Sequence, residues 1–223
     1  VDIGDLPGGL ETALGLGVND TGRIVGWSHG ELGWRGFVHD IGGLMFDIGY
    51  LPGGRLPWSI AYDVNNDGLV VGRSFDGDNL RSVLWDETNG LRLMGDAPGV
   101  LRSDPADVND LGQVVGAASV GVDTPFIWDA ITGMRLIDDD PEWQYEIATA
   151  INEHGVVAGG SAVPYVWTET GGFVRIEENL DLSSAGWRLN HIYDINDHGV
   201  MVGVGNFEGG PGYGVVLTPV PEL

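Results

Sequence analysis

The sequence predicts an all-β protein, a five-bladed β-propeller with four-stranded blades, from three observations. A nine-residue motif recurs five times, short apolar segments follow every copy, and the first nine residues repeat an internal stretch. A near-constant period close to 44 residues is typical of propellers and other repeat arrays. The motif copies contain Asn19, Asn65, Asn109, Asn152 and Asn196, which are 46, 44, 43 and 44 residues apart in succession.

Each repeat unit contains four short segments with strand character. The first ends at the Asn of the motif, and the second carries the apolar residues that follow its Gly. The third holds an apolar triplet, and the fourth follows another Gly turn, as in residues 90–94 and 133–137. Strands of this length between Gly and Asn turns indicate an all-β fold, and four strands form one propeller blade. We expect the triplet residues Trp85, Trp128 and Trp167 to fill the seams between blades.

The two ends of the chain predict a closed ring. Residues 1–9 read VDIGDLPGG and residues 46–54 read FDIGYLPGG, so the chain begins on a segment that elsewhere contains a fourth strand. We expect Val1–Leu6 to be the fourth strand of the last blade, which removes its exposed edge. An open solenoid would instead require distinct capping units. The chain is then one domain over 1–223, with units at roughly 7–51, 52–96, 97–138, 139–178, and 179–223 together with 1–6.

The second copy of the motif resembles the start of a calcium loop. It places oxygen-bearing side chains at alternate positions, in Asp63, Asn65 and Asp67. The other copies lack this set, and no later carboxylate completes it. Every copy keeps Asn followed by Gly three residues later, a pair that predicts a hairpin with a type I turn and a Gly bulge. We expect five such turns and no cofactor, with weak calcium binding at Asp63, Asn65 and Asp67 as the alternative.

Composition sets the class of partner. The 223 residues include 33 Asp and Glu against 10 Arg and no Lys, and the net charge is −23. Such a surface repels nucleic acid and anionic membranes, so we expect neither as a partner. The chain has no Cys, which excludes disulfides and thiol catalysis, and no apolar run approaches the roughly 18 residues of a membrane span. Because residue 1 is Val, we expect a processed or trimmed chain.

The units resemble the HAF repeats of bacterial extracellular proteins. The Ile/Val-Asn-x-x-Gly-x-Val-Val-Gly core of that family corresponds to the motif in all five units. The following Phe-x-Trp strand is clearest at 126–128 and 165–167, and the D-L-G-x-L-G-G-like link is similar to residues 2–9 and 47–54. The resemblance covers nearly the whole chain. It implies a repeat fold and export, and it supplies no catalytic residues.

This sequence departs from the family at the triplet that gives the repeat its name. The His of His-Ala-Phe is absent from the first three units, where residues 35–37 read RGF, 81–83 read RSV and 124–126 read TPF. The end of the chain, LTPVPEL, looks like the start of a Pro-Glu-Pro sorting tail. We expect the protein to be secreted or at the surface of a bacterial cell.

One face of the predicted propeller carries the irregular loops. The links between blades and the loops between second and third strands meet there, whereas the repeating hairpin turns lie on the opposite face. Variable loops on a rigid scaffold usually carry recognition, and aromatic, guanidinium and carboxylate groups together hold sugars. The alternative is that these Trp residues pack in seams or lie on separate loops. The candidate ligand-binding residues are Trp34, Arg35, Arg55, Trp58, Arg102, Glu142, Trp143, Trp187, Arg188 and His191.

These observations predict a binding or structural propeller that recognises a polysaccharide or another cell-surface or matrix component. A glycoside hydrolase or lyase with carboxylates at the central channel is the first alternative. The many acidic residues select no catalytic pair, so whether the chain is an enzyme stays open. A protein that self-assembles by strand swapping is the second alternative, although we expect a monomer.

Overall fold

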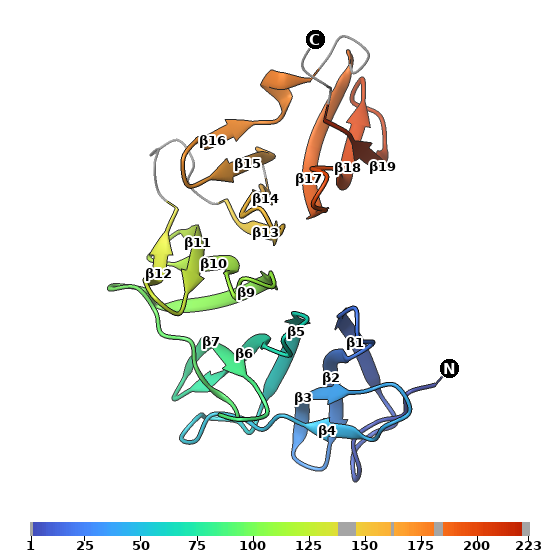
Figure 1. Cartoon of the computed structure of the whole chain (residues 1–223), viewed down its shortest axis with the longest axis vertical. Coiled ribbons are helices and arrows are strands. Elements are labelled where there is room, and N and C mark those ends of the chain that lie inside the picture. Colours follow the sequence, from blue (N-terminus) through green and yellow to red (C-terminus); the bar gives the residue numbers. More distant parts are fainter. Residues whose placement is uncertain (1, 138–145, 162, 181–184, 220–223) are drawn as a thin grey trace.

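Five antiparallel sheets account for almost all regular structure in the computed structural model, which describes residues 2–137, 146–161, 163–180 and 185–219. The sheets stand side by side around an open arc, and each sheet is one blade (Figure 1). The innermost strand of every blade is its first strand. The described residues also contain the short 3₁₀ helix η2 (Glu177–Asn179). The predicted all-β class is confirmed.

The strands follow the repeat units in order. Blade 1 contains β1 (Ala13–Val18), β2 (Ile24–Gly30), β3 (Gly33–His39) and β4 (Met45–Asp47). Blade 2 contains β5 (Ser59–Val64), β6 (Val70–Asp76), β7 (Asn79–Trp85) and β8 (Arg92–Leu93). Blade 3 contains β9 (Arg102–Val108), β10 (Val114–Ser119), β11 (Asp123–Asp129) and β12 (Gly133–Leu136). Blade 4 contains β13 (Ala148–Ile151), β14 (Val157–Gly159), β15 (Tyr165–Thr168) and β16 (Gly172–Arg175). Blade 5 contains β17 (Trp187–Ile195), β18 (Met201–Phe207) and β19 (Gly212–Leu217).

The hairpin turns between first and second strands have the predicted geometry. In blade 1 the N–H of Gly22 donates to the carbonyl of Asn19 at 2.9 Å, and the N–H of Asn19 donates to the carbonyl of Arg23 at 3.0 Å. Gly22 has a φ of 82°, which residues with a Cβ rarely adopt. The N–H of Thr21 donates to Oδ1 of Asn19 at 3.1 Å. The same main-chain bonds recur in the other four turns, so the Asn and Gly of each motif build the turn.

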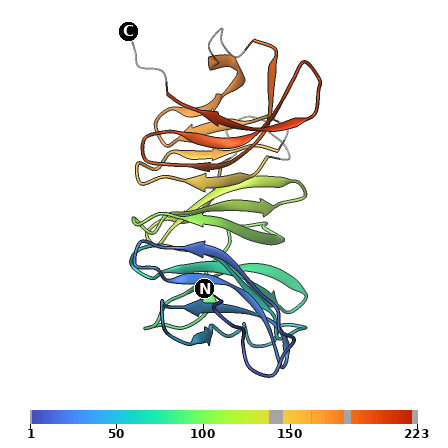
Figure 2. The same ribbon diagram turned by 90° about the vertical axis from the view of Figure 1, so that its right-hand side faces the viewer.

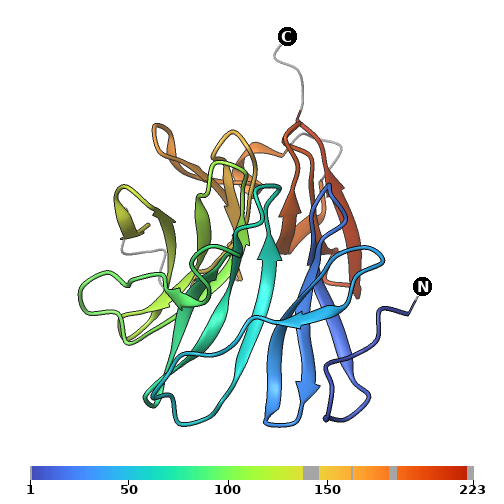
Figure 3. The same cartoon turned by 60° about the horizontal axis from the view of Figure 1, so that its bottom comes forward.

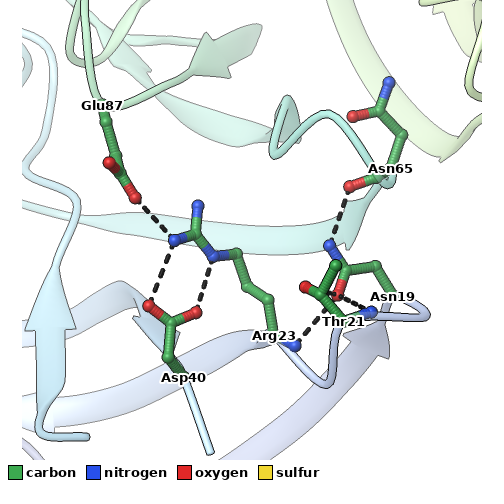
Figure 4. A network of polar contacts seen from close by, with 6 residues as sticks. All are labelled: Asn19, Thr21, Arg23, Asp40, Asn65 and Glu87. Carbon is green, nitrogen blue, oxygen red and sulfur yellow. Dashed lines mark hydrogen bonds and ion pairs between the residues drawn. The ribbon is translucent and has the colours of Figure 1, made fainter.

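The motif asparagines also join neighbouring blades. Nδ2 of Asn19 donates to the main-chain carbonyl of Asn65 at 3.0 Å (Figure 4). The same bond recurs from Asn65 to Asn109, from Asn109 to Asn152 and from Asn152 to Asn196, at 3.0 to 3.1 Å. We call this series the asparagine ladder. The ladder links all five blades at the end of the channel where the motif turns lie, which we call the turn end. Each motif Asn therefore shapes its own turn and also holds that turn against the next blade.

The hydrophobic core is divided among the seams between blades. Four clusters of buried residues lie between successive blades, from blade 1 against blade 2 to blade 4 against blade 5. Trp85, Trp128 and Trp167 each belong to one cluster and are buried, as predicted. Burial of apolar surface contributes about 25 cal/mol per Å², so burial in these seams stabilises the packing of one blade on the next.

The predicted role of Val1–Leu6 as the fourth strand of blade 5 is not found in the described residues. Residues 2–6 form no strand, blade 5 has three described strands, and the N-terminal segment runs along blade 1 (Figure 3). Leu6 is buried there, and its N–H donates to Oγ of Ser28 at 2.9 Å. Leu51 makes the same bond to Ser74, so the repeat assigns Leu6 to the link that enters blade 1. By sequence, only residues 1–3 remain equivalent to the end of β4 and the residue that follows it.

Candidate functional site

A cavity of about 440 Å³ opens on the irregular-loop face between blades 2, 3 and 4. Its walls come from the ends of strands that approach this face, chiefly β5, β9, β10 and β13. The lining is mainly apolar, with a small number of polar groups. Its residues are Tyr62, Leu80, Arg102, Ser103, Asp104, Pro105, Ala106, Ala117, Ser119, Asp123, Ile147, Ala148 and Thr149. An apolar cleft with few polar groups is the usual form of a small-molecule site.

Asp104, which lines this cavity, forms an ion pair across the seam between blades 2 and 3 with Arg73, which is not itself a lining residue. Nη1 of Arg73 on β6 lies 2.5 Å from Oδ2 of Asp104 on β9. Nε of Arg73 and Oδ1 of Asp104 are buried and have no hydrogen-bond partner among the described residues. Arg102 and Asp123 form a second, exposed pair at the rim, with Nη2 and Oδ1 2.9 Å apart. The wall therefore offers both cationic and anionic groups to a polar ligand.

Arg73 and Asp104 both interrupt the repeat. The equivalents of Arg73 in the other blades are Trp27, Ala117, Gly160 and Val204. At the position of Asp104 the other blades carry Leu14, Ile60, Ile147 and His191. Each of these two positions therefore carries an Arg or Asp in a single blade, with Arg73 in blade 2 and Asp104 in the adjacent blade 3. Sequence reasoning missed Arg73, although a comparison of the five units position by position contains this signal.

Aromatic rings surround the guanidinium of Arg73. Its Cζ lies 5.3 Å from the ring centroid of Trp58 and 5.4 Å from that of Tyr62. The ring of Trp58 also packs on Phe75, with centroids 5.5 Å apart. Cation–π contacts of this kind hold the guanidinium in place. The rings thereby present apolar surface beside the charged pair.

The surroundings shift the pKa values of two side chains that line the cavity, Asp104 and Tyr62. Burial raises the pKa of Asp104, and the positive charge of Arg73 offsets part of this effect. Burial and then the negative charge of Asp104 raise the pKa of Tyr62, so its hydroxyl keeps its proton at neutral pH. The hydroxyl group of Tyr62 and the carboxyl group of Asp104 therefore line one wall, and the guanidinium of Arg73 pairs with that carboxyl group.

Three of the predicted ligand-binding residues lie at or near this cavity. Arg102 lines it, and Trp58 contacts Arg73, the ion-pair partner of the lining residue Asp104. Arg55 lies over the ring of Phe75, with Cζ 4.5 Å from the centroid, and so belongs to the same aromatic group. Asp104, one of the many acidic residues among which the sequence selects no catalytic pair, also lines the cavity.

The structure places the other predicted residues elsewhere. Trp34 packs on Trp27 in blade 1 with centroids 4.0 Å apart, and the buried Arg35 pairs with Asp47 at 2.9 Å. In blade 5, Trp187 packs on Phe207 and Tyr213, and His191 packs on Tyr193. Arg188 lies on β17 in the same blade. Glu142 and Trp143 lie outside the described residues. The described tryptophans of the irregular face therefore belong to three separate blades.

A second cavity, of about 280 Å³, lies at the turn end of the channel, where the motif turns of all five blades line it. Seven carboxyl groups contribute to this lining, and no basic side chain does. Among them, burial and the neighbouring Asp63 raise the pKa of Asp107 well above its ordinary value. Asp63 and Asp107 are therefore close neighbours at the turn end.

The predicted calcium ligands lie at this turn end. Oδ2 of Asp63 accepts the N–H of Val108 at 3.1 Å, and Oδ1 of Asn65 accepts the N–H of Leu69 at 2.9 Å. Asp67 is exposed. The oxygens of Asp63 and Asn65 thus have structural partners, and calcium binding stays a prediction. Within the described ranges, no group of three or more His, Asp or Glu side chains is arranged to hold a metal ion.

Comparisons with known proteins support the fold. No family model and no curated protein matches the chain. Among solved structures the chain is similar to TolB from Acinetobacter baumannii, with a TM-score of 0.58 and 12% identity over 88% of this chain. The chain spans about half, 50%, of the length of that TolB chain. The likeness, together with the five antiparallel sheets, defines a β-propeller-like repeat protein. No helix in the described part of the chain is long and apolar enough to cross a membrane.

Proposed function

We propose that this β-propeller-like protein is a binding module outside the cell or on its surface, and that the cavity between blades 2, 3 and 4 binds a carbohydrate. The carbohydrate would belong to a polysaccharide or another matrix component. The proposal treats the five sheets as the blades of a five-bladed propeller. The HAF-like repeats support export, and the net charge of −23 supports a neutral rather than an anionic ligand.

The ion pair between Arg73 and Asp104 carries the proposal. Charged residues at otherwise mainly apolar repeat positions do not improve the packing of the seam, and a pair of this kind is often no more stable than an apolar replacement. Beside a cavity, the pair supplies a donor and an acceptor for adjacent hydroxyl groups of a sugar. Tyr62 lines the cavity beside this pair, and its ring can cover the apolar face of the sugar. The cavity of about 440 Å³ is large enough for one or two sugar rings.

The proposal is tested by incubation with a panel of insoluble polysaccharides, with retained protein and released reducing ends measured in the same tubes. We expect retention without release. Arg73→Gln should weaken the retention roughly tenfold or more, because a hydrogen bond to a charged group contributes about 1.5–3 kcal/mol. Tyr62→Phe tests the hydroxyl separately from the ring and should have a smaller effect.

Arg135→Gln is the matched control. Nη2 of Arg135 pairs with Oε2 of Glu169 at 2.9 Å, so this variant also removes an Arg–carboxylate pair between adjacent blades. Unlike the Arg73–Asp104 pair, this pair has no member that lines the cavity, and retention should be unchanged. Equal loss in both variants would contradict the assignment of the site. Release of reducing ends would identify a glycoside hydrolase or lyase, and an absence of retention on every polysaccharide would overturn carbohydrate binding.

A further inference from the structure

The two ends of the arc expose residues that are buried at every other seam. Val18 on β1 is 66% exposed, whereas its equivalents in blades 2 to 5 are buried. Val202 and Val216 on blade 5 are 42% and 67% exposed, whereas Val25 and Val38 at the same positions of blade 1 are buried against blade 2. The two end faces therefore carry the two halves of an apolar seam. Figure 2 looks into the opening between them.

The polar groups of a seam are also present on the two faces. Asn196 stands at the end of the asparagine ladder, and its Nδ2 has no partner among the described residues, while the carbonyl of Asn19 begins the ladder. A second series of hydrogen bonds involves the residue directly after each motif Asn, whose N–H donates to a side chain of the next blade. The first bond runs from Asp20 to Asn66 at 2.9 Å, and the last runs from Glu153 to Asp197 at 2.9 Å. Among the described residues, the N–H of Asp197 and Oδ1 of Asp20 have no partner and are the two ends of this second series.

A third type of contact ends in the same way. Oδ2 of Asp107 accepts the N–H of Ile151 in the next blade at 2.7 Å, and Oδ2 of Asp63 accepts that of Val108. Asp194 occupies this repeat position in blade 5. The next blade around a closed ring is blade 1, where Val18 is the equivalent of Val108. Asp194 therefore carries an acceptor for the same bond at the fifth seam.

We infer that the end faces of blades 1 and 5 of one molecule form a fifth seam with these contacts, and that the ring closes without a fourth strand in blade 5. Turns from both end blades, at residues 18–20 and 194–197, line the same cavity of about 280 Å³, so the faces already oppose each other within one molecule. Closure within one chain also avoids the loss of translational freedom that association with a second copy costs.

Cysteine cross-linking tests this inference cleanly, because the chain has no Cys. The exposed turn positions Thr21 and His198 are equivalent and belong to blades 1 and 5. Treated with a short bismaleimide, the Thr21→Cys/His198→Cys variant should form an intramolecular cross-link at least about tenfold faster than a pair two blades apart, Thr21→Cys/Leu111→Cys. The neighbouring pair Asp67→Cys/Leu111→Cys gives the rate for a complete seam.

Each outcome of the cross-linking decides the inference. A rate close to that of the neighbouring pair supports closure. A rate no faster than that of the pair two blades apart overturns it. Cross-links only between molecules would also overturn it, because the faces would then join separate copies.

Polar substitution of the end face gives a second, independent readout. Val216→Asn should lower Tm by about 4 °C or more if closure buries this residue, because an unpaired amide is then taken from water. Ile131→Asn is the control, since Ile131 is 96% exposed on an outer turn of blade 3. It should change Tm by no more than about 1 °C. Equal Tm values for the two variants would show that the end face of blade 5 stays in water and would overturn the closed ring.

Discussion

The two ends of the central channel are built from the same five repeats, but they use polar side chains in opposite ways. At the turn end, the ladder asparagines of blades 1 to 4 each bond to the next blade through the same atoms. At the irregular-loop end, the pair of Arg73 and Asp104 occurs at one seam, and two of its buried polar atoms have no hydrogen-bond partner among the described residues. Repetition of a contact satisfies polar groups and builds the fold, whereas the charged pair that interrupts the repeat is, in our proposal, retained for ligand binding and not for stability.

The largest effect is expected from the middle of the asparagine ladder. Asn109→Ala removes the bond to the carbonyl of Asn152 and the acceptor for the N–H of Gln113, both of which are buried or half-buried. The free energy of unfolding should fall by about 2–3 kcal/mol, measured by urea denaturation. Asp67→Ala, at an exposed turn position, is the control and should cost less than about 0.5 kcal/mol. A loss in Asn109→Ala no greater than that of the control would show that the ladder does not stabilise the blades.

At the irregular-loop end, substitution is expected to raise the free energy of unfolding and not to lower it. The double variant Arg73→Val/Asp104→Ile restores residues found at these positions in other blades. It should raise the free energy of unfolding by about 1 kcal/mol, because well-packed apolar residues often replace a partly buried ion pair without loss. Polysaccharide retention should disappear in the same variant. Lower stability together with normal retention would contradict the distinction between the two ends.

The pH dependence of stability separates the inner and outer carboxyl groups. The folded-state pKa of Asp107 is raised by burial and by Asp63, so the folded protein binds more protons than the unfolded chain above the ordinary value of 3.8. The contribution of Asp107 to the free energy of unfolding is therefore fully present below pH 3.8, and it is lost as the pH rises through the raised pKa. Tm of Asp107→Asn should fall less with rising pH than Tm of the unchanged protein.

Asp129 provides the control of opposite sign. Its hydrogen bonds with Thr132 lower the pKa of Asp129, so its contribution is present above the ordinary value of 3.8 and is lost as pH falls. Asp129→Asn should reduce the loss of Tm at acidic pH and leave the slope at higher pH unchanged. If Asp107→Asn showed the same pattern as Asp129→Asn, the raised pKa of Asp107 would be wrong.

The smallest effect is expected at the surface of the turn end. Nε of Arg23 pairs with Asp40 at 2.8 Å, and its Nη2 reaches Glu87 in blade 2 at 2.5 Å (Figure 4). Both carboxylates are exposed, so Arg23→Gln should cost about 0.5–1 kcal/mol, and less at high salt. Unfolding in urea at low and high salt measures this difference. A cost that does not depend on salt would show that packing of the side chain, and not its charge, is responsible.

Much of the fold could be predicted because the repeat is local. Asn and Gly at fixed positions define each turn, and the apolar triplets place Trp85, Trp128 and Trp167 in the seams. The assignment of Val1–Leu6 was less successful, since similarity to residues 46–51 did not show where the strand ends and the link begins. In the structure Leu6 belongs to the link, through its bond to Ser28.

The candidate site was predicted only in part. The sequence pointed to the irregular-loop face and to Trp58 and Arg102, because aromatic and charged residues in irregular loops can be recognised without coordinates. It did not show that Trp34, Trp58 and Trp187 belong to three separate blades with their own ring partners. Nor did it reveal Arg73, which lies inside a strand, where charge is usually read as solvent exposure.

The sequence by itself determined the all-β class, the five units, the turns and the seam residues, because each depends on residues close together in one unit and on a period that repeats. Tertiary structure alone decided which departures from the repeat meet. Arg73 and Asp104 are 31 residues apart and form one pair because β6 and β9 pack across a seam. The same packing makes Val18 and Val216, at opposite ends of the chain, the exposed halves of a seam. Such contacts depend on the curvature of the whole arc, which no single repeat specifies.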